Sequence, residues 1–296
     1  MKKIYLLLLF AGFTALKLDA QTADSTKVDP TWKLDGSVSL NFVQSSFSNW
    51  SAGGDNSVSG TAAGLLNLIC KKNKLLWENV LNSGYGQTFL KNEKRKNDDR
   101  IDFSSKLGYV ASEKWNYAFL TGLKTQFDKG YMFYPVEDPN IYNSKFFAPA
   151  YLILSLGMDY KPNDDFSLYL SPVTARLTIV ADDYLSDMGA FGVDPGKRVY
   201  TGFGAYLRSS YNMKLHQNIL LNTSVELFSN YLDKPQNIVV NWDASIDMKV
   251  TKFISAKLQM QLMYDDKTKM IEADGTMTGP RVQFKQVLGV GFSYIF

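Results

Sequence analysis

Apolar and polar residues alternate with a period of two over most of this chain. From Ile238 to Val250 every second side chain is apolar, and the positions between them are mostly polar. Residues 254–264 repeat the same arrangement. A helix would scatter such side chains around its axis, whereas a strand places each set on one face. The pattern therefore predicts β-strands that have one apolar face and one polar face.

Segments of this kind recur about twelve times after residue 31. The predicted strands span 32–43, 57–70, 75–85, 100–111, 115–127, 149–160, 166–178, 198–213, 219–228, 237–250, 253–265 and 281–296. Soluble strands usually run about 5–6 residues, whereas an inclined strand needs roughly 9–11 residues to cross a bilayer. The third strand, with Glu78 and Asn82, and the seventh, with Pro172, fit the pattern least well.

The connections between these strands alternate in length. The short ones are 71–74, 112–114, 161–165, 214–218 and 251–252, and the long ones are 44–56, 86–99, 128–148, 179–197, 229–236 and 266–280. Short periplasmic turns and longer outside loops are typical of outer-membrane barrels, and an even strand number places both ends on the periplasmic side. The predicted fold is all-β: a transmembrane antiparallel up-and-down β-barrel of about 12 strands, within residues 32–296.

The first twenty residues have a different character. Lys2 and Lys3 precede an apolar run over residues 4–13, and Leu18-Asp19-Ala20 follows. This is typical of a secretory signal peptide, removed after Ala20. An uncleaved anchor helix is the alternative, but the apolar run is short for a membrane span. Residues 21–31 are expected to form a flexible periplasmic lead-in, and the predicted location is the cell outer membrane.

Composition excludes several classes of protein. Aromatic residues make up 14% of the chain and charged residues only 21%, and there is one Cys and one His. A disulfide scaffold needs paired cysteines, and a structural zinc site needs about four Cys or His ligands. The net charge of +3, from 32 basic and 29 acidic residues, gives no sign of nucleic-acid binding.

The aromatic residues concentrate at the ends of the predicted strands. Those expected at the periplasmic rim, facing lipid, are Trp32, Trp77, Tyr109, Trp115, Tyr160, Phe166 and Tyr211, and those near the opposite rim are Phe89, Phe127 and Tyr264. Amphipathic rings prefer the headgroup level, so the pattern predicts two aromatic girdles. The alternative is that these are core aromatics of a soluble β protein.

The last strand carries the most specific signal. Counting back from the end, every second residue is apolar or aromatic: Phe296, Tyr294, Phe292, Val290 and Leu288. This resembles the C-terminal signal by which the outer-membrane assembly machinery recognises barrel proteins. An extended strand with an unpaired edge is suited to pairing with another sheet edge. The expected partners are therefore the barrel assembly machinery during biogenesis and the lipids of the outer membrane.

The first long loop resembles a known family. Residues 49–56 read Asn49-Trp50-Ser51-Ala52-Gly53-Gly54-Asp55-Asn56, which is similar to a motif in a Bacteroidota family of outer-membrane barrels classed as a domain of unknown function. Residues 77–79, 84–86 and 166–172 and the last strand are also similar. The resemblance would cover most of residues 32–296 and implies an outer-membrane barrel from that phylum, but no activity. Asn49, Trp50, Gly53 and Gly54 either form a turn or place Trp50 against a ligand or partner.

Catalytic groups are scarce. The single histidine, His216, falls in a predicted periplasmic turn, which is the wrong end for a barrel phospholipase or an Asp/His protease. Asp182-Asp183 and Asp265-Asp266 are expected to be solvated loop carboxylates without a full calcium pattern. Cys70 is interpreted as a small apolar side chain that fills space, and not as a nucleophile. We therefore expect no enzyme activity, no cofactor and no metal site.

The inward faces of the strands hold the remaining information. The charged residues at the alternating positions that are expected to point into the lumen are Arg100, Asp102, Lys106, Lys124, Asp159, Arg208, Glu226, Asp243, Asp247, Lys249, Lys257 and Lys285. On the lipid face such charges would cost a few kcal/mol each near the midplane. They either form a salt-bridged plug or line a narrow polar channel. The leading functional hypothesis is a porin-like passage for small hydrophilic solutes, and the alternative is a structural or accessory subunit of an outer-membrane complex.

Overall fold

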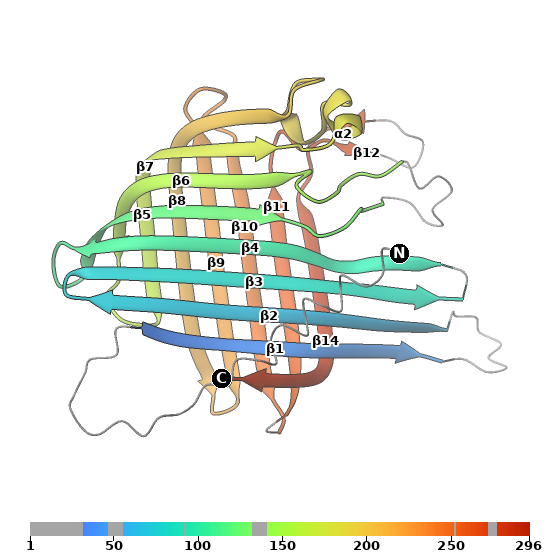
Figure 1. Ribbon diagram of the computed structural model, residues 1–296, viewed down its shortest axis with the longest axis horizontal. Helices are drawn as coiled ribbons and strands as arrows, with labels where there is room; N and C mark the ends of the chain where they lie inside the picture. The colour runs from blue at the N-terminus through green and yellow to red at the C-terminus, as the bar shows by residue number, and fades with distance from the viewer. Residues whose placement is uncertain (1–31, 47–55, 92, 132–140, 252, 272–276) are drawn as a thin grey trace. The chain divides into compact units, whose positions relative to one another are not determined.

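The computed structural model describes residues 32–46, 56–91, 93–131, 141–251, 253–271 and 277–296. The predicted signal peptide, the lead-in and the Trp50 loop motif lie outside these residues. Twelve long strands pair antiparallel and close into one barrel, in which each strand neighbours those before and after it in the chain and the first pairs with the last (Figure 1). The predicted all-β barrel of about twelve strands is therefore confirmed.

The strand bounds follow the predicted ones closely. The barrel consists of β1 (Trp32–Ser45), β2 (Ser57–Lys72), β3 (Leu75–Leu90), β4 (Lys94–Val110), β5 (Trp115–Thr125), β6 (Ala150–Tyr160), β7 (Phe166–Ile179), β8 (Val199–His216), β9 (Ile219–Asn230), β10 (Ile238–Lys249), β11 (Ile254–Tyr264) and β14 (Gln283–Ile295). The largest difference is at β4, which begins at Lys94 and not at residue 100. Residues 94–99 are mostly charged and have no apolar alternation, so the sequence pattern did not predict this part of the strand.

The loops carry short elements that the sequence pattern did not predict. They are helix α2 (Asp183–Asp187), the 3-10 turn η2 (Ala190–Gly192) and a hairpin of β12 (Met270–Ile271) and β13 (Met277–Thr278). None of them is long enough to show a period. No helix in the described ranges is long and apolar enough to cross a membrane.

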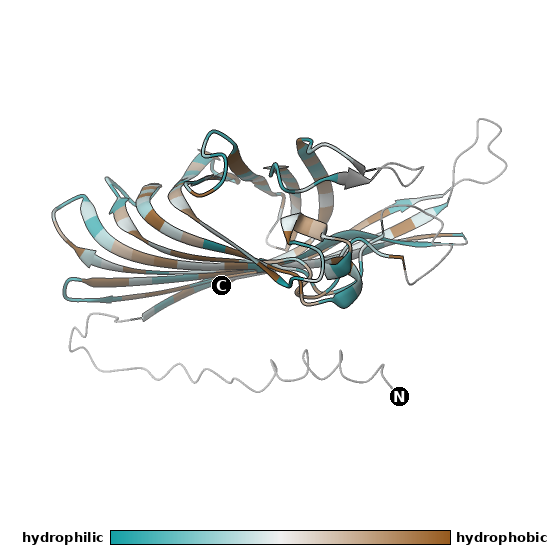
Figure 2. Cartoon of the chain, turned by 90° about the horizontal axis from the view of Figure 1, so that it is seen from above, coloured by the Kyte–Doolittle hydropathy of each residue, from teal (hydrophilic) through white to brown (hydrophobic). Residues whose placement is uncertain are grey.

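The outer face of the barrel is apolar. Leu40, Phe119, Leu156 and Phe292 are among many large apolar side chains that are 40% or more exposed on alternating positions, and alternating bands of hydropathy are visible along the strands in Figure 2. We call the end of the barrel with the short connections the turn end, and the end with the long connections the loop end. Aromatic rings meet at the turn end, where Trp32 on β1 and Trp77 on β3 lie on either side of Cys70 with ring centroids 5.8 Å apart. An apolar exterior around a polar interior is the distribution of a transmembrane barrel.

Pro172 interrupts β7 in a way that matters for the interior. The pairing of β7 with β8 shifts between Ser171 and Thr174, and the pairing of β6 with β7 shifts at the same place. Proline has no N–H to donate, so it is accommodated at a bulge. The extra residue changes the parity of β7, and Arg176 is consequently buried inside the barrel instead of facing lipid.

The barrel closes at a short seam. β1 and β14 share only six register pairs, from Ser37–Ile295 to Phe42–Val290, whereas β2 and β3 share sixteen. Phe296 extends the seam by exchanging two backbone hydrogen bonds with Gly36, of 2.9 and 3.0 Å. A Cβ atom at Gly291 would overlap the carbonyl oxygen of Leu40, so the two strands approach this closely because glycine stands there.

Candidate functional site in the barrel interior

Ion pairs cross the interior of the barrel. Lys124 on β5 lies 2.8 Å from Glu226 on β9, although three strands separate them around the wall. Arg208 on β8 donates a hydrogen bond of 2.9 Å to Ser104 on β4. Arg208 is also 3.8 Å from Glu226, its direct cross-strand neighbour. Such contacts between distant strands are possible only through the lumen, so this network links opposite sides of it.

Large side chains fill the lumen beside this network. The inner faces of β5 and β7–β10 contribute a buried cluster, which we call the packed wall: Ala118, Leu120, Tyr169, Tyr206, Phe228 and Val239. Tyr169 is 1% exposed, and its hydroxyl donates to Ser155 Oγ at 3.0 Å. The Arg176 guanidinium lies 5.8 Å from the centroid of the Phe228 ring and 2.8 Å from Asp265. This side of the interior is built like a protein core.

A second charged cluster lies nearer the turn end. Lys106 is 2.7 Å from Asp159 and 3.1 Å from Glu78. Lys161, in the turn after β6, also pairs with Glu78. Ser167 donates to the other oxygen of Asp159 at 2.7 Å. Each charge in this cluster therefore has a partner of opposite sign, which favours a structural function over ligand binding.

The opposite side of the interior is lined by small residues. The inner faces of β14, β1, β2 and β3, which we call the seam wall, bring together a strip of side chains in consecutive registers: Ser39, Asn41, Thr61, Ala63, Gly84, Gly86, Gly289 and Gly291. One register row runs from Gly291 through Asn41, Thr61 and Gly86 to Asp98 on β4. The small residues let neighbouring atoms come close: a Cβ atom at Gly84 would lie 2.5 Å from Asp98 Oδ2, and one at Gly86 would lie 2.4 Å from Thr61 Oγ1.

One ion pair crosses this small-residue strip. Lys285 on β14 lies 2.6 Å from Asp98 on β4, and β1, β2 and β3 separate the two strands. The Asp98 side chain is 4% exposed and that of Lys285 is 40% exposed. Asn41 Oδ1, Asp98 Oδ2 and Arg100 Nε are buried polar atoms without a hydrogen-bond partner among the described residues, although the Arg100 guanidinium lies 3.9 Å from Asp98 Oδ2. Buried polar atoms call for hydrogen bonds, so this part of the interior suits water or a polar solute.

The loops after β5 and β7 pack together at the loop end. Asp182 caps α2 by accepting from the Leu185 amide at 3.1 Å, and it also accepts from the Tyr142 hydroxyl and from Lys145. Burial, the largest single influence, raises the pKa of the Asp182 carboxyl, but these hydrogen bonds together lower its pKa below the ordinary 3.8. Val180 and Val193 are buried beside them. Asp182 is thus buried and bonded, and the expectation of a solvated carboxylate is wrong.

The predicted interior residues take different places in these groups. Lys124, Arg208 and Glu226 form the central network, with Asp102 3.8 Å from Lys124. Lys106 and Asp159 belong to the turn-end cluster. Arg100 and Lys285 lie beside Asp98, and Lys257 pairs with Asp247 at 3.0 Å on the neighbouring strand. Asp243 and Lys249 share the inward register of β10.

Three interior charges were missed by the sequence pattern. Glu78 counted only as a poor strand residue, Asp98 fell in a predicted loop, and Arg176 follows the Pro172 bulge, which reverses the parity of β7. Proline in an alternating segment is the signal that would have found Arg176.

The residues considered for catalysis are dispersed. His216 ends β8 at the turn end and is exposed, and Cys70 is half-buried on β2. Asp265 pairs with Arg176, and Asp266 accepts from Asn237 at 2.7 Å. Within the described ranges, no three His, Cys, Asp or Glu side chains are grouped so that they could hold a metal ion.

Comparisons with solved structures find many barrels of low similarity. The chain shares 13% identity with the COG4313 outer membrane channel from Pseudomonas putida F1, with a TM-score of 0.39 and coverage of 93% of this chain and 100% of that one. The NanC porin shares 9% identity, with a TM-score of 0.35 and coverage of 87% and 98%. The translocator domain of the autotransporter NalP from Neisseria meningitidis shares 9%, with a TM-score of 0.35 and coverage of 99% and 96%.

A family model matches the first part of the barrel. No curated protein matches the chain. Residues 42–131, less than half of the chain, match the family described as "Protein of unknown function (DUF3078)". The match includes the Trp50 loop and strands β2 to β5. The expected resemblance to a family of unknown function is therefore confirmed over these residues.

Proposed function

We propose that this protein is an outer-membrane barrel that lets small hydrophilic solutes pass along its seam wall. The observation that carries the proposal is the strip of small residues on the inner faces of β14, β1, β2 and β3, beside buried polar atoms of Asn41, Asp98 and Arg100 that have no hydrogen-bond partner in the described ranges. The packed wall fills the other side of the lumen with Leu120, Tyr169 and Phe228. A barrel of twelve strands lies between the small filled barrels and the open porins, so a narrow passage on one side is a natural outcome.

The pair of Lys285 and Asp98 would control this passage. It crosses the strip with one charge of each sign, so the intact pair favours neither anions nor cations strongly. Removal of one partner leaves the other charge in the path. The sign of the remaining charge then decides which ions pass more easily.

The test is ion conductance in planar bilayers. The unaltered barrel should give small, discrete conductance steps of weak selectivity. Asp98→Asn should make the passage anion-selective because Lys285 and Arg100 remain. The double variant Lys285→Met/Arg100→Met removes both cations beside Asp98 and should shift the selectivity toward cations. Asp183→Asn, which breaks the exposed pair of Asp183 and Arg198 in the loop after β7, is the control and should leave the selectivity unchanged. A consistently silent barrel, or equal selectivity in all variants, would contradict the proposal.

A structural or accessory subunit of an outer-membrane complex is the second candidate. It is favoured by the ion pairs that cross the lumen and by exposed apolar loop residues at the loop end, Ile141 at 64% and Leu232 at 74% exposure. Gentle detergent extraction followed by pull-down should then recover a partner in fixed stoichiometry. Recovery of the barrel alone would count against this candidate.

A further inference from the structure

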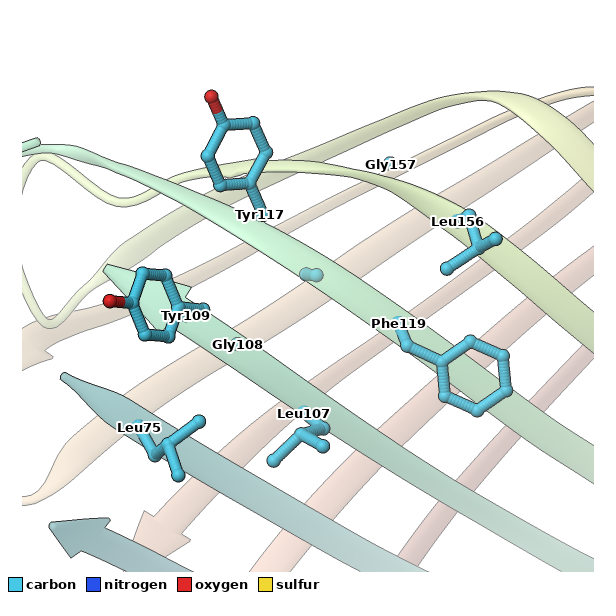
Figure 3. A pocket seen from close by; sticks show the side chains of 9 residues that line it. Leu75, Leu107, Gly108, Tyr109, Tyr117, Phe119, Leu156 and Gly157 are labelled. Atoms are coloured by element: carbon cyan, nitrogen blue, oxygen red, sulfur yellow. The ribbon is translucent and has the colours of Figure 1, made fainter. Parts of the chain in front are cut away.

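A groove runs along the outer face of the barrel near the turn end. It has a volume of about 360 Å³, and the side chains that line it, from β3 to β6, are those of Leu75, Leu107, Tyr109, Tyr117, Phe119 and Leu156 (Figure 3). Leu107, Phe119 and Leu156 share the outward register of their strands and are 44%, 40% and 58% exposed. In a transmembrane barrel this face meets lipid tails, so an acyl chain is the natural occupant.

The two ends of the groove differ. Tyr109 and Tyr117 are cross-strand neighbours, and Figure 3 shows both rings at the end away from Phe119 and Leu156. Tyr109 lies one residue before the end of β4 and Tyr117 two residues after the start of β5, so their hydroxyls mark the turn end. Tyrosine prefers the level where lipid tails meet headgroups. A lipid in this groove would have its headgroup beside the β2–β3 and β4–β5 turns.

Positive charge is concentrated in those two turns. Lys72, Lys74 and Lys114 are exposed, and no ion pair between described residues involves them. Lys74 directly precedes Leu75 of the groove, and its carbonyl accepts from the amide of Val110 at 2.8 Å, so it lies beside the end of β4. Glu113 is the one acidic residue in these two turns.

We propose that this face binds an anionic phospholipid of the adjacent leaflet. One acyl chain lies in the groove between Leu107, Phe119 and Leu156, and the phosphate is bound by Lys74 and Lys114, with Lys72 beside them. Charge complementarity decides the occupant. A second copy of this chain, related by a two-fold axis, would bring the lysines of both copies together, which like-charge repulsion disfavours.

Native mass spectrometry of the purified barrel tests this inference. The protein is equilibrated with phosphatidylglycerol or with phosphatidylcholine of the same chain length, and the lipid retained is counted. We expect phosphatidylglycerol to be retained preferentially. The triple variant of Lys72→Gln, Lys74→Gln and Lys114→Gln should lose this preference, because each lysine near an anionic headgroup strengthens binding about fivefold.

Matched variants separate the groove from general effects. Leu156→Trp fills the groove and should reduce retention of both lipids, whereas Leu258→Trp, on the outer face of β11, should not. The triple variant of Lys91→Gln, Lys197→Gln and Lys234→Gln removes three exposed lysines at the loop end and should keep the preference. Heat-shifted mobility on gels checks that each variant forms a closed barrel.

Three results would overturn the inference. One is an unchanged preference in the triple variant of the turn lysines. Another is equal retention of both lipids by the unaltered protein, which would mean that the groove binds acyl chains but does not distinguish the two headgroups. The third is a dimer that disappears with Leu156→Trp, which would make this face an interface between copies. Conductance is independent of these results, so failure here would leave the proposed passage standing.

Discussion

The two sides of the barrel interior are stabilised in different ways. The packed wall buries large side chains, and Leu120, Tyr169 and Phe228 are each less than 5% exposed. The seam wall has small residues inside and relies on close backbone approach, with Gly291 against Leu40. The packed wall is thus built like a protein core, whereas the seam wall closes the ring through close backbone contact. Closure of this barrel therefore depends on side-chain burial on one side and on backbone contact on the other.

The largest effect is expected from Gly291→Ala. A Cβ atom at this position would overlap the backbone of Leu40, so the closing strands would have to separate. We expect a loss of about 3 kcal/mol or more in the free energy of unfolding, seen as loss of heat-shifted mobility on gels. Gly64→Ala is the control, since a Cβ there meets only Ser83 Oγ, at an ordinary 3.6 Å. Equal behaviour of the two variants would show that the seam tolerates separation.

Phe228→Ala should weaken the packed wall without opening the seam. Truncation of a buried phenylalanine leaves a cavity and costs about 3–5 kcal/mol. It also removes the ring beside Arg176. The urea midpoint of unfolding should fall, and conductance should rise because the cavity widens the lumen. Ser39→Ala on the seam wall should change the midpoint little; a fall as large as that of Phe228→Ala would end the distinction between the walls.

Glu226→Gln should have a somewhat smaller effect. It leaves Lys124 and Arg208 without their shared carboxylate in the interior, and breaking a buried ion pair costs about 3 kcal/mol. The double variant Lys124→Met/Glu226→Met should lose less than Glu226→Gln, because no unpaired charge from this pair remains. Additive losses, measured by denaturant unfolding of all the variants, would mean that the pair is solvated and adds little rigidity.

The smallest effect is expected at low pH, in the loops around Asp182, which lie outside both walls. Because the pKa of Asp182 is lowered in the folded protein, its contribution is present above its ordinary pKa of 3.8 and is lost as pH falls further, through the folded value. We expect the loop layer to loosen below about pH 4, by about 1 kcal/mol, while the barrel remains closed. Proteolysis of the loop between β7 and β8 at pH 6 and pH 3.5 measures this. Asp182→Asn should reduce the difference between the two pH values.

Much of the fold could be predicted from the sequence, because a barrel that crosses a membrane must alternate along every strand. The predicted starts of β1, β2, β3, β5 and β7 agree with the structure. β4 was shortened because Lys94, Lys96 and Asp99 look like a loop, although they form strand at the loop end. Alternation records the face of a residue, but not how far a strand extends beyond the membrane.

The interior was harder to predict. Parity identified Lys124 and Glu226 as inward residues, but nothing in a linear pattern shows that strands β5 and β9 approach each other across the lumen. The division into a packed wall and a seam wall depends on which strands face one another. Arg176 was missed because a single extra residue at Pro172 reverses the face of everything after it.

The position of Phe296 has a practical consequence. Its backbone carries two hydrogen bonds of the closing seam, and its ring lies where a side chain at residue 36 would stand, 2.6 Å from the position of a Cβ atom. An affinity tag fused after this residue would begin within the pairing of β1 with β14, which has only six register pairs. A tag inserted at Gly279, where nothing lies within 4 Å of an added Cβ, avoids the closure. Purification handles and fluorescent labels for this barrel therefore belong at the loop end.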